Sequence, residues 1–196
     1  MPQISRKEFE RLPLRVHDLL SGVPLHDLWA VDLPHARSGI TLDEFLRTAS
    51  GPPCRPSSLA RALLNVRLLV GRLLRWDREP AAAAHEYFAT RLTSADRSQS
   101  LVPAGAREGL FRVVYRFENE QLLELINRTA HAAALSALVE RANAYRFYFG
   151  VYVRNINRFT PLYMALIDPF RKLVVYPSLL RTVRTTWNQT FGAASQ

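Results

Sequence analysis

The clearest hydrophobic pattern in this chain lies in the run YRFYFGVYVRNIN, residues 145–157. Its odd-numbered positions, from Tyr145 to Val153, are apolar or aromatic, and a period of two places them on one face of a strand. The even-numbered positions place arginine and tyrosine on either side of Gly150. The first face therefore predicts contact with a core. The second face predicts either a solvent-exposed sheet surface or a surface that binds an anionic or flat partner.

Two other parts of the chain carry strand patterns. LHDLWAVDLP, residues 25–34, alternates so that Trp29 and Asp32 point to opposite faces, and it ends at a proline. LFRVVYRF and QLLELINR, residues 110–117 and 121–128, are separated by a short polar segment. This spacing predicts an antiparallel hairpin around a tight turn.

Two segments have no decisive pattern. In AHAAALSALVER, residues 130–141, alanine, leucine and glutamate favour a helix, whereas the position between two strand-like runs favours a strand. As a strand, this segment places mostly alanine on either side, and small side chains leave space beside them. Residues 80–108 are alanine-rich and then polar, and their TSADRSQS segment is predicted to be a flexible loop.

Capping patterns predict helices in the first part of the chain. A Ser-x-x-Glu pattern at Ser5 predicts a helix over residues 6–12, and a Thr-x-x-Glu pattern at Thr41 predicts another over residues 42–49. A longer amphipathic helix is predicted over residues 57–76, with leucine and valine on one side and arginine on the other. Its arginine face is either solvated or suited to an anionic membrane or to phosphate.

The end of the chain predicts a long helix. Thr160 is a suitable N-cap, and Pro161 occupies the first helical position. Pro169 and Pro177 lie inside the helical pattern and predict bends, because an interior proline removes a backbone hydrogen bond. The predicted apolar stripe consists of Leu162, Leu166, Phe170, Leu173, Leu180 and Trp187.

Length and composition predict a single globular domain. The 196 residues are 48% hydrophobic and 22% charged, which provides enough apolar material for one core. We assign residues 25–188 to this domain, residues 1–24 to an N-terminal extension and residues 189–196 to a flexible tail. The start of the chain lacks a signal-peptide pattern, and no apolar run is long enough to span a membrane, so a cytoplasmic location is expected.

The net charge of +9 would favour binding to a nucleic acid or to an anionic membrane surface. Lysine occurs only at Lys7 and Lys172, and the arginines are dispersed among acidic residues instead of forming a basic run. A nucleic-acid partner is therefore not expected, and a membrane surface stays an alternative to a small molecule.

The chain carries no recognisable motif for a cofactor, a metal or a nucleophile. Cys54 is the only cysteine, which excludes an internal disulfide and a CxxC site. The histidines are scattered without metal-ligand spacing, and phosphate loops, dinucleotide glycine motifs and GxSxG elbows are missing. We therefore expect no metal and no cofactor.

The segment YVRNINRFTPLYMALIDPFRKLVVYPSLLR, residues 152–181, resembles an uncharacterised bacterial domain family. The residues that carry the resemblance are Arg154, Asn155, Asn157, Tyr163, Asp168, Pro169 and Phe170, together with LWAVDLP and ALLNVRLLVGRLL earlier in the chain. That family is similar to the START and polyketide-cyclase-like (SRPBCC) superfamily. The resemblance implies an α+β helix-grip fold, in which a curved antiparallel sheet wraps around a long C-terminal helix, with smaller N-terminal helices. It also implies that residues 130–141 form a strand.

Members of this superfamily hold apolar or amphipathic small molecules between the sheet and the long helix, and some catalyse cyclisation or dehydration there. The resemblance therefore implies that this chain binds such a ligand. The alternatives are an enzyme of the same fold and an arginine-rich module that binds an anionic membrane or nucleic acid.

The candidate site residues follow from this reading. The candidate ligand-binding residues are Trp29, Leu135, Phe147, Phe149, Asn155, Tyr163 and Phe170. Aromatic residues at this spacing also form plain cores, and asparagine at a strand end also caps turns. No catalytic residue is assigned, and His131 and Asp32 are the candidates for an acid and a base.

Overall fold

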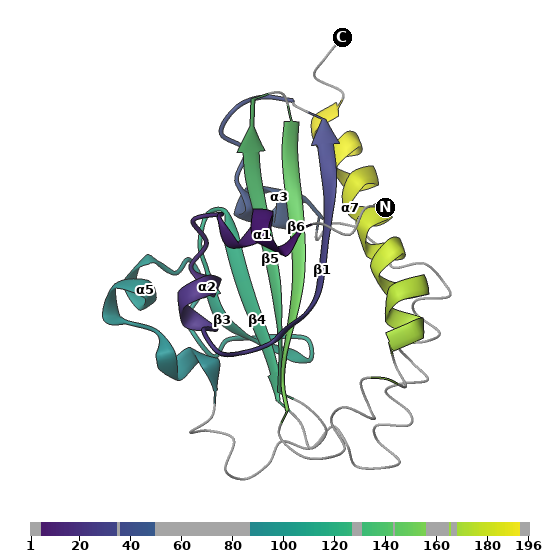
Figure 1. The fold of residues 1–196 in the computed structure, drawn as a ribbon. Helices are drawn as coiled ribbons and strands as arrows, with labels where there is room; N and C mark the ends of the chain where they lie inside the picture. Colours follow the sequence, from purple (N-terminus) through teal and green to yellow (C-terminus); the bar gives the residue numbers. More distant parts are fainter. Residues whose placement is uncertain are drawn as a thin grey trace.

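The computed structural model describes residues 5–34, 36–49, 87–126, 131–142, 144–155, 165 and 168–192. Its centre is a six-stranded antiparallel sheet with the strand order β1-β6-β5-β4-β3-β2 (Figure 1). The strands are β1 Leu25–Pro34, β2 Arg107–Glu108, β3 Phe111–Arg116, β4 Glu120–Ile126, β5 His131–Arg141 and β6 Ala144–Arg154. The first strand therefore pairs with the last one, and the strands between them follow in order.

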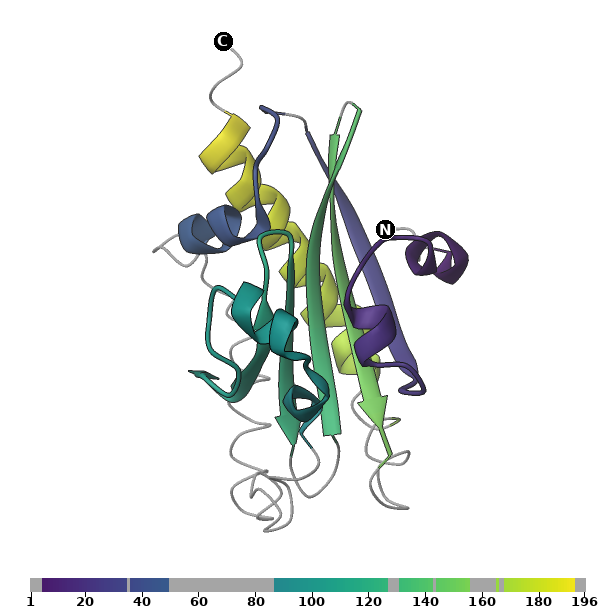
Figure 2. The same ribbon diagram turned by 90° about the vertical axis from the view of Figure 1, so that its left-hand side faces the viewer.

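The fold is α+β and fits the helix-grip description. The helix α7, Tyr176–Phe191, runs along one face of the curved sheet, and α3, Leu42–Ala49, lies on the same side (Figures 1 and 2). The strand predicted over residues 25–34 is confirmed as β1, and the predicted hairpin is confirmed as the β3–β4 pair. The ambiguous segment 130–141 forms the long strand β5, as the resemblance implied.

Shorter helices precede and follow α3. They are α1 Arg6–Glu10, α2 Val16–Leu19, the 3-10 helix η2 Phe88–Arg91 and α5 Ser94–Gln99. Thr41 caps α3, because its Oγ1 accepts a hydrogen bond from the Glu44 amide at 3.1 Å. Ser5 makes no such bond, so the capping box predicted there is wrong. The TSADRSQS segment is not a loop, because Thr93 and Asp96 form a capping box that begins α5.

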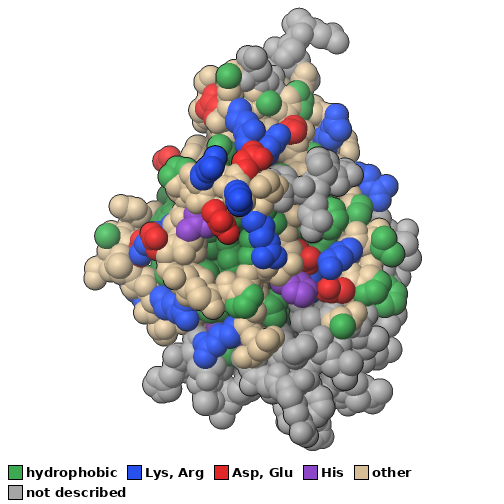
Figure 3. All heavy atoms as spheres, viewed as in Figure 1, with side chains coloured by type: hydrophobic (Ala, Val, Ile, Leu, Met, Phe, Trp, Pro, Cys, Tyr) green, Lys and Arg blue, Asp and Glu red, His purple; other side chains and the backbone are tan. Residues whose placement is uncertain are grey.

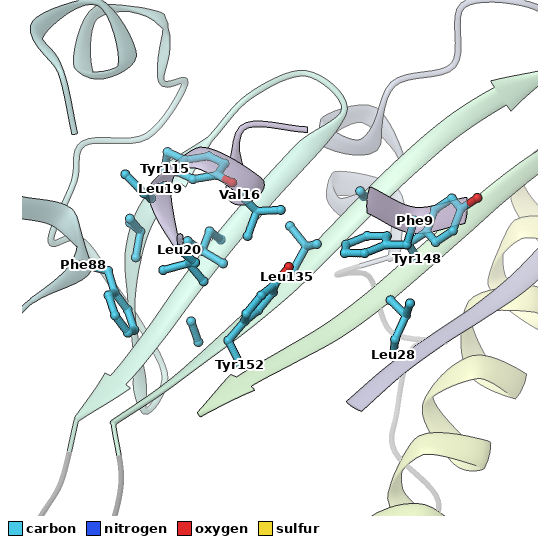
Figure 4. Packing of buried hydrophobic residues seen from close by; sticks show 14 of the residues in the cluster. Phe9, Val16, Leu19, Leu20, Leu28, Phe88, Tyr115, Leu135, Tyr148 and Tyr152 are labelled. Carbon is cyan, nitrogen blue, oxygen red and sulfur yellow. The ribbon is translucent and has the colours of Figure 1, made fainter. Parts of the chain in front are cut away.

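Helices cover both faces of the sheet (Figure 2). On the α7 side, Phe147 and Trp187 are 3% and 0% exposed and belong to one apolar cluster. On the opposite side, Tyr148 and Tyr152 are 0% and 5% exposed and pack with residues of α1 and α2 (Figure 4). The predicted contact of the odd-numbered residues of β6 with a core is confirmed, and this core lies under α7. The prediction that the arginine–tyrosine face of β6 is an outer surface is wrong, because N-terminal residues pack over that face.

Acidic side chains hold the N-terminal segment, residues 5–24, on the sheet. Glu120 of β4 accepts hydrogen bonds from the two backbone amides at the start of α2, at 2.8 and 2.9 Å. Asp96 of α5 accepts hydrogen bonds from the Arg15 guanidinium at 2.8 and 2.9 Å. Glu8 of α1 accepts hydrogen bonds from arginines of β5 and β6. These contacts tie α1 and α2 to strands and to α5, all of which lie far away in sequence.

The chain enters α7 through a π-helical turn, Arg171–Val175. Pro177 follows this turn. Proline disrupts a regular helix in two ways: it has no N–H group to donate, and its ring clashes with the carbonyl four residues earlier. The wider turn changes the phase of the helix, and Phe170 and Leu173 are 53% and 76% exposed. The predicted apolar stripe is therefore confirmed within α7 and wrong at these two residues before it.

Some predictions fall outside the described residues. They concern the helix over residues 57–76, Cys54, Asn157, the cap at Thr160 and Tyr163. Among the helices that are described, none combines the length and the apolar character that a membrane span requires.

Candidate functional site

Trp29 and Phe149 face each other in register on the β1–β6 pair and belong to the side of the sheet that α7 covers. The centroids of their rings lie 5.5 and 5.7 Å from that of Tyr176. Both side chains remain partly exposed. Two of the predicted ligand-binding residues therefore form one partly open aromatic surface with Tyr176, between the sheet and the C-terminal helix.

Phe147 and Leu135 occupy different positions from these two residues. Phe147 lies on the same face of β6, but it is 3% exposed, and its ring centroid is 6.3 Å from that of Phe45 inside the apolar cluster. Leu135 pairs with Gly150, an even-numbered residue of β6, and packs in the cluster beneath α1 and α2. The prediction that places Leu135 in one site with Phe149 is wrong, because neighbouring positions of a strand point to opposite faces.

The remaining predicted ligand-binding residues lie near the ends of elements. Asn155 is an exposed residue directly after β6. Phe170 is 53% exposed and stands immediately before the π-helical turn. Tyr163 lies outside the described residues.

The structure does not bring the acid–base candidates His131 and Asp32 together. They pair with opposite ends of β6, about 26 Å apart along the strand. His131 is buried, with its ring centroid 3.9 Å from that of Phe88 and its Nε2 3.2 Å from the Glu124 carboxylate. Asp32 lies at the surface, where hydrogen bonds from Arg146 lower its pKa against the opposing effect of burial.

A charged cluster lies beside the aromatic surface, next to a β-bulge at the start of β1. The pairing of β1 with β6 shifts by one residue at His26. From Asp27 onward the alternation is regular, so Asp27 lies on the same face as Trp29, toward α7, and it is 5% exposed. The Asp27 carboxylate accepts hydrogen bonds there from the Tyr176 hydroxyl, at 2.9 Å, and from the Arg171 guanidinium. These two bonds join a buried carboxylate of the sheet to the start of the C-terminal helix.

Asp168 forms the other part of this cluster. Its carboxylate lies 3.1 Å from His26 Nε2, 3.1 Å from Lys172 Nζ and 3.2 Å from Arg171 Nη2. Burial by itself raises the pKa of Asp168, but hydrogen bonds from His26 and Lys172 and the charge of Arg171 lower it below its ordinary value. Carboxylates and cations therefore balance in this cluster. We call it the Asp27 junction, and it consists of His26, Asp27, Asp168, Arg171, Lys172 and Tyr176.

The model of a family described as "Protein of unknown function (DUF2867)" matches residues 19–178. The chain belongs to this family. No curated protein and no solved structure matches the chain significantly. The DUF2867 match includes Trp29, Phe149 and the complete Asp27 junction, whereas α1 and nearly all of α2 precede it.

The Asp27 junction contains side chains that often bind metals. Ligand atoms of His26, Asp27 and Asp168 lie within 4.8 Å of one another in this DUF2867 chain. Arg171 and Lys172 each lie within salt-bridge distance of both carboxylates. Their positive charges neutralise the two carboxylates and repel a divalent cation at the same place. We therefore assign no metal to the junction.

Sequence reasoning missed most of the Asp27 junction. Asp27 lies two residues before Trp29, so strand alternation places a carboxylate on the core face, where it needs a buried partner. That was the available signal. Asp168 entered only through the family resemblance, and no pattern in the DUF2867 region points to Tyr176. Its contact with Asp27 depends on the π-helical turn that precedes α7, which a regular period does not reveal.

Proposed function

We propose that the protein binds a small apolar or amphipathic molecule between the sheet and the start of the C-terminal helix. The observation that carries this proposal is the partly open aromatic surface of Trp29, Phe149 and Tyr176, with the charged Asp27 junction at its edge. Aromatic walls combined with a few convergent polar groups are the usual composition of a small-molecule site.

The opposite end of the same interface is filled by side chains. Trp187 is 0% exposed, and its ring centroid lies 5.6, 5.0 and 4.8 Å from those of Phe45, Tyr145 and Phe191. Packing of this density leaves little space for a ligand without a rearrangement of the core. The end of the interface near Tyr176 is therefore the better place for a bound molecule.

The chemistry of the junction favours binding over the enzyme alternative. Efficient acid–base catalysis requires a group whose pKa lies near the working pH. The lowered pKa of Asp168 makes this carboxylate a weak proton acceptor near neutral pH. Asp27 is engaged by the Tyr176 hydroxyl and by Arg171. Such paired carboxylates suit the orientation of cationic donors better than the transfer of protons.

The exposed cation at the edge of the site indicates the kind of ligand. The Lys172 side chain is 45% exposed, and its ammonium group has three donors. We infer an amphipathic molecule whose apolar part lies on Trp29 and Phe149 and whose polar end accepts a hydrogen bond from Lys172. The resemblance to the START-like superfamily supports the same position, since its members hold such molecules between the sheet and the long helix.

Native mass spectrometry of the protein purified from its own cells tests this proposal. We expect a small molecule to be retained in roughly equimolar amount and to be released for identification on denaturation. The Phe149→Leu substitution should reduce retention, because leucine keeps apolar bulk but removes the flat ring surface.

Phe147→Leu is the matched control, because Phe147 lies on the same strand and the same face but inside the packed cluster. This control should lower stability and leave retention unchanged. The proposal fails if the purified chain carries no small molecule, or if Phe149→Leu retains as much of it as the wild type.

A further inference from the structure

A hollow lies on the face of the sheet opposite α7. It opens between α1, α2 and the turn that leads into β1, and its volume is about 310 Å³. Figure 3 shows hydrophobic side chains in the recess near the middle of this face, surrounded by charged side chains. Pockets for small molecules begin at roughly 300 Å³. The hollow therefore has room for a compact organic molecule.

The N-terminal segment supplies most of the wall of the hollow. The apolar lining consists of Phe9, Val16, Leu20, Val23, Leu25 and Tyr152. Arg6, Glu10 and His17 contribute polar atoms to the lining. Arg6 and Glu10 carry opposite charges, which offset each other. Gly22 has a φ of 80°, a left-handed conformation that favours glycine, in the turn that returns the chain from α2 to β1.

Tyr152 lines the hollow with an unpaired hydroxyl. The residue is 5% exposed, and the hydroxyl points from β6 toward the space between α1 and α2 (Figure 4). Among the residues that the structure describes, this hydroxyl has no hydrogen-bond partner. The other buried tyrosines of the described chain bond through their hydroxyls to neighbours: Tyr115 to Glu120, Tyr145 to Arg37, Tyr148 to Arg141 and Tyr176 to Asp27. The hydroxyl is not among the completely buried polar atoms that lack a partner, so it is open to the hollow, and its hydrogen-bonding capacity is available to a ligand atom.

The surroundings of Tyr152 restrict the charge of that ligand. Burial, and then the charges of Glu120 and Glu10, raise the pKa of the Tyr152 hydroxyl above its ordinary value. The hydroxyl therefore keeps its proton at physiological pH and is available as a donor. The same carboxylates repel an anionic group placed beside the hydroxyl.

We propose that this hollow is a second binding site, for an uncharged amphipathic small molecule whose acceptor atom takes the hydrogen bond of the Tyr152 hydroxyl. The apolar part of the molecule lies against Phe9, Leu20 and Leu25. The sheet separates this site from the Asp27 junction. Because α1 precedes the DUF2867 match, part of the wall comes from residues outside the family region.

Fluorescence titration of the full chain with prodan, an uncharged dimethylamino-naphthyl ketone, tests the proposal. Its ketone is an acceptor, and its emission moves to shorter wavelength in an apolar environment. We expect saturable binding with such a shift. Tyr152→Phe keeps the ring and removes the donor, so the affinity should fall by about three- to tenfold. Ser21→Trp adds a large side chain from an exposed position of the lining and should abolish the saturable signal.

Two controls separate this site from others. Ser98→Trp adds the same bulk to an exposed position of α5 and should bind prodan like the wild type. Phe149→Leu alters the surface beside the Asp27 junction and should leave the prodan signal of the hollow intact. Absence of saturable binding to the wild type overturns the proposal. Wild-type affinity for prodan in both Tyr152→Phe and Ser21→Trp would also overturn it. The same holds if Phe149→Leu removes the prodan signal and Ser21→Trp retains it.

Discussion

Asp96 shows how one acidic side chain connects segments that are distant in sequence. Its Oδ2 accepts a hydrogen bond from the Thr93 amide at 2.8 Å and so caps α5. The same carboxylate accepts two hydrogen bonds from the guanidinium of Arg15, at 2.8 and 2.9 Å, in a bidentate arrangement. Arg15 lies at the start of α2, so the cap of one helix also positions the other.

Asp96 should make stability depend on pH in the acidic range. The hydrogen bonds from Arg15, with those from Thr93, lower the pKa of Asp96 from 3.8 to about 2 against the effect of burial. A lowered carboxyl pKa stabilises the fold above the unfolded-state value, and this contribution disappears as the pH falls toward the folded-state value. After allowance for solvent screening, Asp96→Asn should cost about 1 kcal/mol near neutral pH.

Urea unfolding of the wild type and of Asp96→Asn at a series of pH values measures this effect. The difference between the two free energies of unfolding should shrink as the pH falls from about 4 toward about 2, because the wild-type carboxyl becomes protonated there. Asp18→Asn is the control, since Asp18 also bonds Arg15 but its side chain is 79% exposed. A difference that stays constant through this pH range would rule out the proposed role of the Asp96 charge.

The strands were easier to predict than the short helices. Residues 25–34 form β1 with the predicted bounds, and Trp29, Val31 and Leu33 alternate onto the face that meets an apolar layer. The usual capping-box pattern ends in glutamate or glutamine, whereas the box of α5 has aspartate at the third helical position, so this pattern does not predict α5. α2 has only four residues, and the carboxylate at its start belongs to Glu120. A cap that comes from a distant strand leaves no pattern in the sequence around the helix, so α2 could not be predicted locally.

Glu120 provides a test of how α2 is held. Its two carboxylate oxygens accept the amides of Arg15 and Val16, and a glutamine retains one acceptor oxygen only. An unsatisfied buried amide costs about 1–3 kcal/mol. In Glu120→Gln, we therefore expect the amides of α1 and α2 to exchange with deuterium about tenfold faster, by local opening of the segment. The amides of β5 and β6 should keep their protection.

Glu118→Gln is the matched control, because Glu118 lies in the turn directly before β4 and is exposed. Hydrogen exchange of both variants, measured by mass spectrometry, shows whether Glu120 holds only α1 and α2 or supports the complete fold. Equal exchange of α1 and α2 in the two variants would mean that the carboxylate of Glu120 does not hold the segment. Faster exchange throughout the sheet would mean that it supports the complete fold instead.

The complete fold has its sheet as a middle layer, and this arrangement explains which parts of the site could be predicted. Trp29 and Phe149 followed from strand alternation, and the structure places them side by side facing α7. The burial of the even-numbered face of β6 could not be predicted from the same alternation, because tyrosine and arginine are also typical of solvent-exposed sheet surfaces. The ring of Tyr148 is buried here, and its hydroxyl accepts a hydrogen bond from Arg141 Nη2 at 2.8 Å, so its polar atom keeps a partner.

Because the sheet is the middle layer, truncating either of two adjacent residues of β6 should lower the free energy of unfolding by a similar amount. Phe147 and Tyr148 point to opposite faces and are 3% and 0% exposed. We expect Phe147→Ala and Tyr148→Ala each to lower the free energy of unfolding by about 3–5 kcal/mol, and the partly exposed Phe149→Ala to lower it less. A face open to water would instead limit the loss for Tyr148→Ala to about 0.5 kcal/mol. Urea unfolding of the three variants distinguishes these outcomes. Since Phe9 of α1 packs on Tyr148 and also lines the hollow with Tyr152, a small loss would remove the physical basis of that second site as well.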